Sequence, residues 1–198
     1  MGYLGHFRSN AAALELYVYI VCIDCICSNV NLKKYKLNMM TIAVDFDGTC
    51  VTHDFPKVGK NIGAEIVLKK LADKGHKIIL YTMRSHPSEK TEKAGTSGMI
   101  PTTNDCLQDA IDWFVKYDIP LYGVNDNPSQ HSWTDSPKVY ANLYIDDAAL
   151  GIPLVYNDMS PMTRPYVGWV RVTELLYESG VLTYGDMMEI KKEFNKRY

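Results

Sequence analysis

Cysteine is scarce in this chain and unevenly placed. Three of its five cysteines, Cys22, Cys25 and Cys27, fall within the first 30 of 198 residues, and the other two, Cys50 and Cys106, are far apart. Such a set makes no disulfide framework, and the first cluster lacks the second ligand pair expected of a zinc site. We therefore expect a reducing compartment and place the protein in the cytoplasm.

An excess of charge of one sign is also missing. Lysine and arginine number 21 against 23 aspartates and glutamates, which leaves a formal net charge of -2 at pH 7. This balance provides no electrostatic case for nucleic-acid binding, although a small or local partner stays open. Internal repeats and low-complexity tracts are absent, and 46% of the residues are apolar. That composition is typical of a globular protein with a full core.

The longest apolar stretch, residues 11–30, is a poor membrane span. Glu15 and Asp24 interrupt it, and a charged group at the centre of a bilayer costs about 2.5–3.5 kcal/mol. A signal peptide would need a basic start and a small-residue cleavage site, which the segment lacks. We expect residues 1–40 to be an extension outside the fold, with the methionine pair 39–40 as the true start of translation. A packed helix and a membrane anchor are the alternatives.

From residue 41 onward, strand and helix patterns alternate. We expect strands at residues 41–46, 77–82, 119–124, 143–145 and 153–156. We expect helices between Asn61 and Gly75, from a cap at Thr103 or Asn104 through the stripe Leu107, Ile111, Phe114 and Val115, and at 169–178 and 186–195. Strands separated by helices pair in parallel through crossovers. The pattern predicts an α/β fold, a three-layer αβα Rossmann-like parallel sheet, in one domain spanning residues 41–198.

Acidic side chains follow two of the expected strands. Asp45 closes the first strand and Asp47 lies two residues further on, Thr82 closes the second strand, and Asp146 closes the fourth, with Asp147 next to it. The carboxyl ends of parallel strands meet at one edge of a sheet, so these groups converge there. Several carboxylates in one cleft repel each other unless a cation joins them, and oxygen ligands with room for water suit magnesium. A metal beside anionic groups also suits phosphoryl transfer.

These motifs carry a family resemblance. The sequence DFDGT at 45–49 after an apolar strand, the strand ending in Thr82, and Lys138 upstream of an apolar-DD sequence resemble the four motifs of the haloacid dehalogenase superfamily. They occur in the same order, across residues 41–156. The segment 136–147 is similar to small capless members among uncharacterised bacterial and phage hydrolases, and to deoxyribonucleotidases.

The resemblance implies a role for each acid. Asp45 is expected to attack phosphorus and form an aspartyl-phosphate, while Asp47 protonates the leaving oxygen and then activates water. The metal ligands implied are Asp45, Asp47 through its backbone carbonyl, Asp146 and Asp147, and the cofactor implied is Mg²⁺. His53, near the same edge, is expected at the surface instead.

The resemblance also implies a phosphate site. The residues expected to bind the phosphate or the rest of the substrate are Thr82, Met83, Arg84, Lys138 and Gly48. Lys138 lies only eight residues before Asp146, which is a short spacing for the superfamily, so Lys57 and Arg84 are alternative sources of positive charge. For Arg84, a surface role is the other interpretation.

The function implied is Mg²⁺-dependent hydrolysis of a small phosphorylated metabolite or nucleotide by a haloacid dehalogenase-type phosphatase. The 34 residues between Asp47 and Thr82 leave no room for a large cap domain, and we expect the loop 85–102 to close over the substrate. One alternative is a polynucleotide-end phosphatase. Another is a signalling domain phosphorylated on aspartate without turnover, but such domains carry that aspartate on a middle strand rather than the first.

Overall fold

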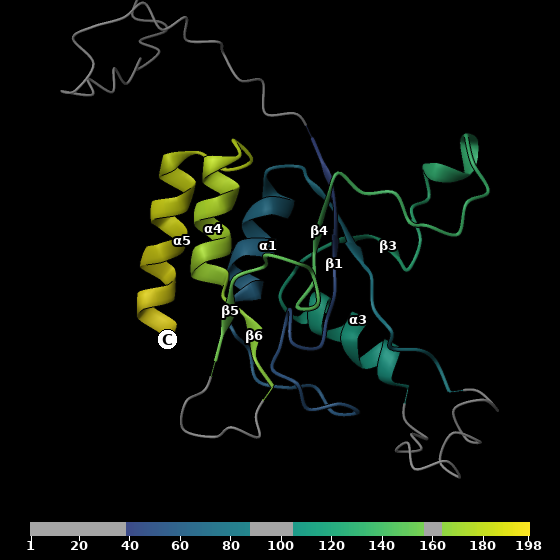
Figure 1. Cartoon of the computed structure of the whole chain (residues 1–198), viewed down its shortest axis with the longest axis horizontal. Coiled ribbons are helices and arrows are strands. Elements are labelled where there is room, and N and C mark those ends of the chain that lie inside the picture. Colours follow the sequence, from purple (N-terminus) through teal and green to yellow (C-terminus); the bar gives the residue numbers. More distant parts are fainter. Residues whose placement is uncertain (1–38, 88–104, 157–163) are drawn as a thin grey trace, which may run out of the picture. The chain divides into compact units, whose positions relative to one another are not determined.

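The computed structural model describes residues 39–87, 105–156 and 164–198 (Figure 1). Almost all of the expected extension 1–40, and most of the expected lid 85–102, lie outside the described residues. The predicted α/β fold is confirmed: a four-stranded parallel sheet is flanked by helices, and no large cap domain is present among the described residues. None of the described helices combines the length and apolar character that crossing a membrane requires.

The sheet consists of four short strands in the order β3-β2-β1-β4. They are β1 (Thr41–Val44), β2 (Lys77–Leu80), β3 (Leu121–Val124) and β4 (Leu143–Ile145). All four residues of β1, at the centre of the sheet, are buried, which explains why Ile42, Ala43 and Val44 are apolar in succession rather than alternating with polar residues. Both neighbours of β1 run parallel to it, so the ends of β1, β2 and β4 lie at one edge.

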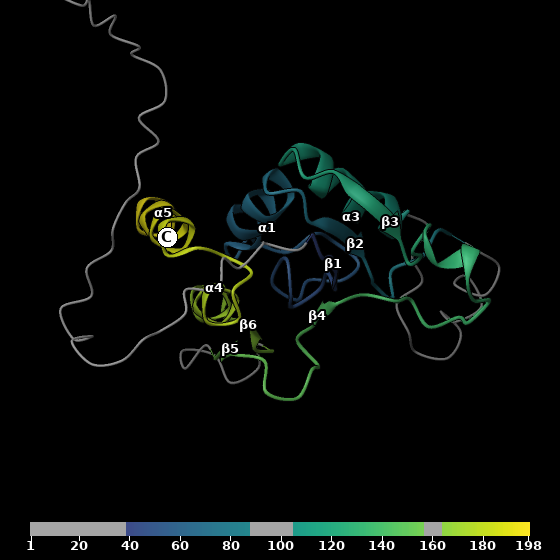
Figure 2. The ribbon, with the colours of Figure 1, turned by 90° about the horizontal axis from the view of Figure 1, so that it is seen from above.

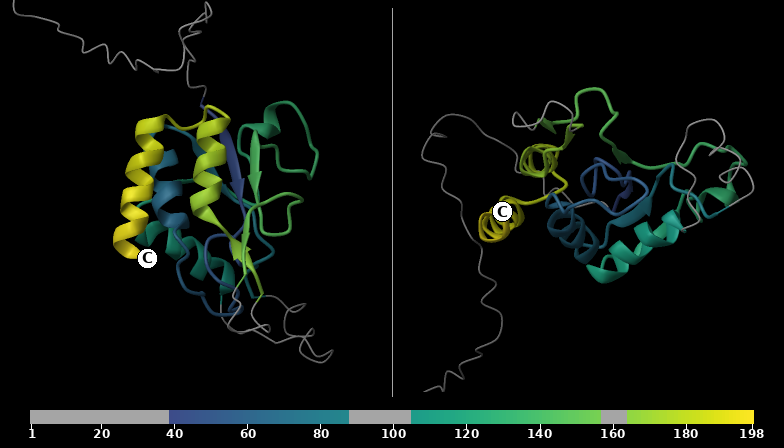
Figure 3. Two further views of the ribbon diagram at one scale, coloured as in Figure 1. Left: turned by 60° about the vertical axis from the view of Figure 1, so that its left-hand side comes forward. Right: turned by 90° about the horizontal axis from the view of Figure 1, so that it is seen from below.

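In the described part of the chain, four helices accompany the sheet: α1 (Ala64–Asp73), α3 (Cys106–Lys116), α4 (Trp169–Glu178) and α5 (Tyr184–Arg197). The connections from β1 to β2 and from β2 to β3 step in the same direction along the sheet. Crossovers of one hand therefore place α1 and α3 on the same side of it (Figures 2 and 3). Helix α5 packs against α1 and α4. The return from β3 to β4 contains the short 3-10 helix η2 (Gln130–Ser132).

The core lies between one face of the sheet and these helices. Alternate strand residues, including Ile42, Val44 and Leu80, enter one buried cluster with Phe114 and Trp169. Burying one such side chain fully stabilises the fold by about 1.5–3 kcal/mol. Leu107 and Phe114 of the predicted stripe are buried as expected, but Val115 is 71% exposed. Val115 follows Phe114 directly, and the 100° turn between them carries its side chain to the outer face of α3.

Several element boundaries differ from the predictions. The expected cap Asn61 does not begin α1, because its side chain instead donates to the Tyr117 hydroxyl and accepts from the Trp113 indole. Asp105 caps α3 by accepting the Gln108 N–H, in place of Thr103 or Asn104. The fifth strand, β5 (Leu154–Val155), does not join the parallel sheet. It pairs antiparallel with β6 (Tyr166–Val167), which is too short to leave a sequence pattern.

Candidate functional site

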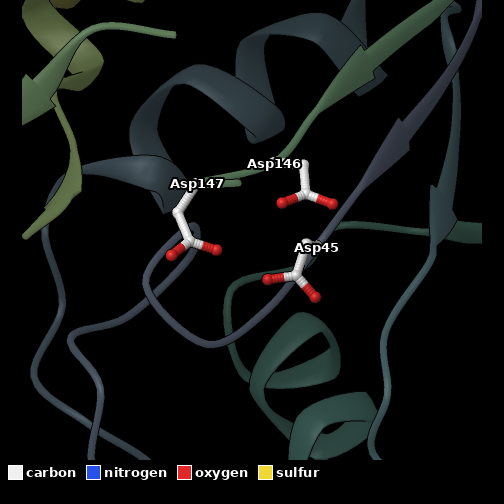
Figure 4. A group of neighbouring side chains, drawn as sticks. All are labelled: Asp45, Asp146 and Asp147. Carbon is white, nitrogen blue, oxygen red and sulfur yellow. The ribbon is translucent and has the colours of Figure 1, made fainter. Parts of the chain in front are cut away.

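Three carboxylates gather at the carboxyl end of the sheet. Asp45 follows β1 directly, and Asp146 and Asp147 follow β4. Because Val44 is paired with Ile145, Asp45 and Asp146 leave the sheet side by side. One oxygen from each of the three carboxylates lies within 4.8 Å of the other two, and Figure 4 shows the three side chains pointing into the same space. We refer to Asp45, Asp146 and Asp147 as the acidic triad.

The acidic triad is electrostatically strained in the absence of a cation. Burial, and then the negative charges of Asp146, Asp147 and Asp47, raise the pKa of Asp45 from 3.8 to about 7, although the backbone N–H of Phe46 acts in the opposite direction. A divalent ion would relieve this repulsion, because it replaces a proton with two positive charges. The donor set consists of carboxylate oxygens from partly buried side chains, which are ligands for a hard cation. The triad can therefore hold a metal ion.

Thr49 links two members of the triad. Its hydroxyl donates to Asp45 Oδ2 at 3.3 Å and accepts the backbone N–H of Asp147 at 3.0 Å. Asp146 is fixed separately, because its Oδ1 accepts the N–H of Ala148 at 2.8 Å. These bonds set the spacing between the end of β1 and the end of β4.

The turn after Asp45 is tight, and it places His53 next to the triad. The carbonyl of Phe46 accepts the N–H groups of residues 49, 50 and 51. Gly48 has φ +81°, a conformation that favours glycine, and a Cβ there would stand 2.2 Å from His53 Nε2, so a larger residue would also displace the imidazole. His53 Nε2 lies 3.2 Å from Asp147 Oδ2, but the direction does not make a hydrogen bond. The expected surface position of His53 is thus wrong, since its side chain is only 15% exposed.

Residues 167–169, far along the chain, form hydrogen bonds with the same turn. The indole N–H of Trp169 donates to the carbonyl of Thr49 at 2.7 Å, and the N–H of Val167 donates to the carbonyl of Gly48 at 2.8 Å. Trp169 is 1% exposed. Thr49 and Trp169, which are 120 positions apart in sequence, therefore share one buried hydrogen bond. No local sequence pattern predicts this contact.

Replacing Trp169 with phenylalanine should reveal how much this support contributes. The ring is largely retained, but the Thr49 carbonyl loses its buried donor, so we expect the free energy of unfolding to fall by about 1–3 kcal/mol. Urea denaturation measures this change. Trp133→Phe is the matched control, because Trp133 is 62% exposed and should leave stability unchanged. Equal stabilities for the two variants would show that the bond to Thr49 contributes nothing.

Asp47 lies outside the acidic triad and is bound by Arg84. The guanidinium donates from Nε to Asp47 Oδ2 at 2.7 Å and from Nη2 to Oδ1 at 2.8 Å. Its other N–H groups reach the carbonyls of Pro56, Lys57 and Cys106. All five guanidinium N–H donors therefore have protein acceptors. Arg84 was predicted to bind phosphate or substrate, whereas here it is 3% exposed and wholly engaged within the fold.

Thr82 and Met83 follow β2 at the same sheet edge. Thr82 is buried, its backbone N–H donates to Asn125 Oδ1 at 2.8 Å, and its hydroxyl accepts the N–H of Arg84 at 3.2 Å. This hydroxyl can still donate its own hydrogen. Met83 is 97% exposed.

The side chain of Lys138 is exposed, and the described residues show no hydrogen bond or ion pair between it and the acidic triad. The chain that follows it reaches the opposite end of the sheet, where the N–H of Asn142 donates to the carbonyl of Thr41. Lys57, the alternative named from the sequence, is also exposed, and its carbonyl accepts from Arg84 beside Asp47.

Comparison with known proteins gives one informative match. No family model and no curated protein matches the chain. The solved structure of a conserved protein from Bacteroides thetaiotaomicron is 30% identical to it, with a TM-score of 0.50. The match covers 76% of this chain and 98% of the Bacteroides chain.

Proposed function

We propose that this chain, which belongs to the same family as the conserved Bacteroides thetaiotaomicron protein, is a Mg²⁺-dependent hydrolase of small phosphomonoesters or nucleotides. The observation that carries the proposal is the acidic triad at the carboxyl end of the sheet, with Asp45 at the end of its first strand. The order of the motifs, which resembles that of haloacid dehalogenase-type phosphatases, supports the same reading. The expected compartment is the cytoplasm.

Asp45 is the proposed nucleophile. One of its carboxylate oxygens forms a bond to phosphorus while the bond from phosphorus to the ester oxygen breaks, and the departing alcohol takes a proton from Asp47. Water then attacks the phosphorus of the aspartyl-phosphate, Asp47 accepts its proton, and phosphate leaves with Asp45 restored. The Thr82 hydroxyl, whose oxygen accepts the N–H of Arg84, is the proposed donor to a phosphoryl oxygen.

The acidic triad would hold the magnesium ion, and the ion would supply the positive charge that lets an anionic nucleophile approach an anionic phosphate. Magnesium is preferred to softer metals because the donor set is made of carboxylate oxygens, and neither sulfur nor imidazole belongs to the triad. The described residues include no large cap, so the site would accept phosphates carried on groups of varied size.

The test is turnover of a panel of phosphomonoesters, including p-nitrophenyl phosphate and nucleoside monophosphates, with Mg²⁺ or with a chelator. We expect phosphate release that requires Mg²⁺, together with acid-stable trapping of phosphate on the chain during turnover. Release that is equally fast in chelator, or no release from any member, would contradict the proposal. Phosphorylation that persists without release would favour a signalling domain, and selective action on phosphorylated oligonucleotide ends would favour the polynucleotide alternative.

A further inference from the structure

The pair formed by Asp47 and Arg84 is asymmetric in its exposure to solvent. The side chain of Asp47 is 20% exposed, whereas that of Arg84 is 1% exposed. The carboxylate is therefore the member of the pair that solvent reaches, and the guanidinium is buried beneath it. A ligand entering from solvent meets Asp47 and not Arg84.

Arg84 is itself fixed from several directions. The carbonyls of Pro56 and Lys57 accept from it on one side, and the carbonyl of Cys106, at the start of α3, accepts from it on another. The rings of Phe46 and Phe55 lie 4.8 and 5.4 Å from its Cζ. A planar fork held by three carbonyls and two rings has one orientation, so the direction of the two bonds to Asp47 is imposed by the fold.

We infer that Arg84 is a positioning residue that aims the Asp47 carboxylate at the reacting oxygen, and that it does not bind the substrate. The inference rests on the proposed function, in which Asp47 transfers protons during hydrolysis. It also accounts for the burial of the arginine. A guanidinium that touched phosphate would need free N–H donors and an exposed face, and Arg84 has neither among the described residues.

A purely structural role for Arg84 predicts a different outcome. If the pair only tied the loop at 54–57 to the end of β2 and the start of α3, its loss would lower stability and would affect every catalytic step alike. If Arg84 aims Asp47, the loss of Arg84 should affect catalysis only through Asp47. The two roles can be told apart by asking whether the falls in kcat caused by changing Arg84 and by changing Asp47 add in the double variant.

The experiment is a double-variant cycle of Arg84→Lys and Asp47→Asn in the full-length protein with Mg²⁺. Lysine keeps the charge but cannot reproduce the planar fork that serves both oxygens of Asp47. We expect Arg84→Lys to lower kcat by roughly 10- to 100-fold, a loss in the range of general acid–base effects, with little change in KM. In the Asp47→Asn background, the same replacement should cause no further loss.

A second readout uses the leaving group. Phenyl phosphate needs protonation of its leaving oxygen more than p-nitrophenyl phosphate does, so Arg84→Lys should slow phenyl phosphate more. Ile190→Ala is the matched control, because Ile190 lies in the core on α5 and its loss lowers stability without touching the site. This control should leave the ratio of the two rates unchanged at a temperature where the protein stays folded.

Phe55→Ala keeps the inference testable if Arg84→Lys does not fold. Phe55 is 48% exposed, and removing its ring uncovers the guanidinium without leaving a buried charge unpaired. We expect a smaller fall in kcat that again vanishes in the Asp47→Asn background. Suppose the wild-type enzyme is active, but in both cycles the fall in kcat caused by changing residue 84 or 55 adds to the fall caused by Asp47→Asn. That result would overturn the inference about Arg84 and leave the proposed function standing. A wild-type protein that hydrolyses no phosphomonoester would overturn the proposed function and this inference with it.

Discussion

Replacing Asp45 with asparagine should abolish turnover and, at the same time, stabilise the metal-free protein at neutral pH. The loss of the nucleophile should lower kcat by roughly 10³-fold or more. The gain in stability follows from the pKa of Asp45, which is raised to about 7 from 3.8 by burial and by the neighbouring aspartates. The folded protein therefore binds this proton more tightly than the unfolded chain does.

The sign of the pH effect can be worked out from these values. The favourable contribution of protonated Asp45 is fully present below about pH 4 and is lost as the pH rises through 7. Above pH 7 the buried charge costs about 2–4 kcal/mol, and asparagine removes that cost. Urea denaturation without Mg²⁺ should show Asp45→Asn to be the more stable protein at pH 8 and similar to wild type near pH 4.

Asp135→Asn is the control for this comparison, because Asp135 is exposed and lies in the loop before β4. It removes the same formal charge and should leave both activity and stability unchanged. An Asp45→Asn protein that retains full turnover would remove the nucleophile assignment. A variant that is inactive but less stable than wild type at pH 8 would mean that Asp45 is not electrostatically strained.

Replacing Asp146 with asparagine should weaken Mg²⁺ binding by roughly 100-fold, because one of three anionic ligands is lost. It should also change how binding depends on pH. In the wild type, Mg²⁺ must displace a proton from Asp45, so affinity should rise about tenfold per pH unit up to about pH 7 and then level off. Among the neighbouring charges, Asp146 contributes most to the raised pKa of Asp45, so the plateau should begin at lower pH in the variant.

Isothermal titration with MgCl₂ across this pH range measures both effects, again beside Asp135→Asn. An Asp146→Asn protein that binds Mg²⁺ as tightly as wild type would place the ion elsewhere. If the Mg²⁺ affinity of the wild-type protein does not depend on pH, Asp45 releases no proton when the ion binds. Asp45 would then not be a ligand that must lose a proton before it can bind Mg²⁺.

The local sequence was sufficient to predict the strands that build the site. Ile42, Ala43 and Val44 form a buried apolar run, and Asp45 ends it. Strand β4 ends in the buried Ile145, and the two aspartates follow it directly. Because parallel strands present their carboxyl ends at one edge, the meeting of the acidic triad follows from these runs and from the alternation of strand and helix.

The partners of these residues could not be predicted in the same way. Arg84 was expected to touch substrate, but its guanidinium is saturated by carbonyls from two other segments. His53 was expected at the surface and lies against Asp147. Trp169, predicted to begin a helix, also supports the turn after Asp45. Each of these contacts joins residues that are not related by a helical or strand repeat. Composition and residue spacing therefore could not predict them.

The sequence by itself determined the type of fold, the edge at which chemistry can occur and the acids that stand there, because burial and chain direction act locally along each strand. Only the tertiary structure decided which of these acids pairs with a buried arginine, since that depends on loops packing across the sheet. It bound Asp47 to Arg84, while Asp45, Asp146 and Asp147 remain together as the acidic triad. The physical reason is that a buried charge must be compensated by a partner close to it in space. Folding can supply that partner from any part of the chain, however distant in sequence.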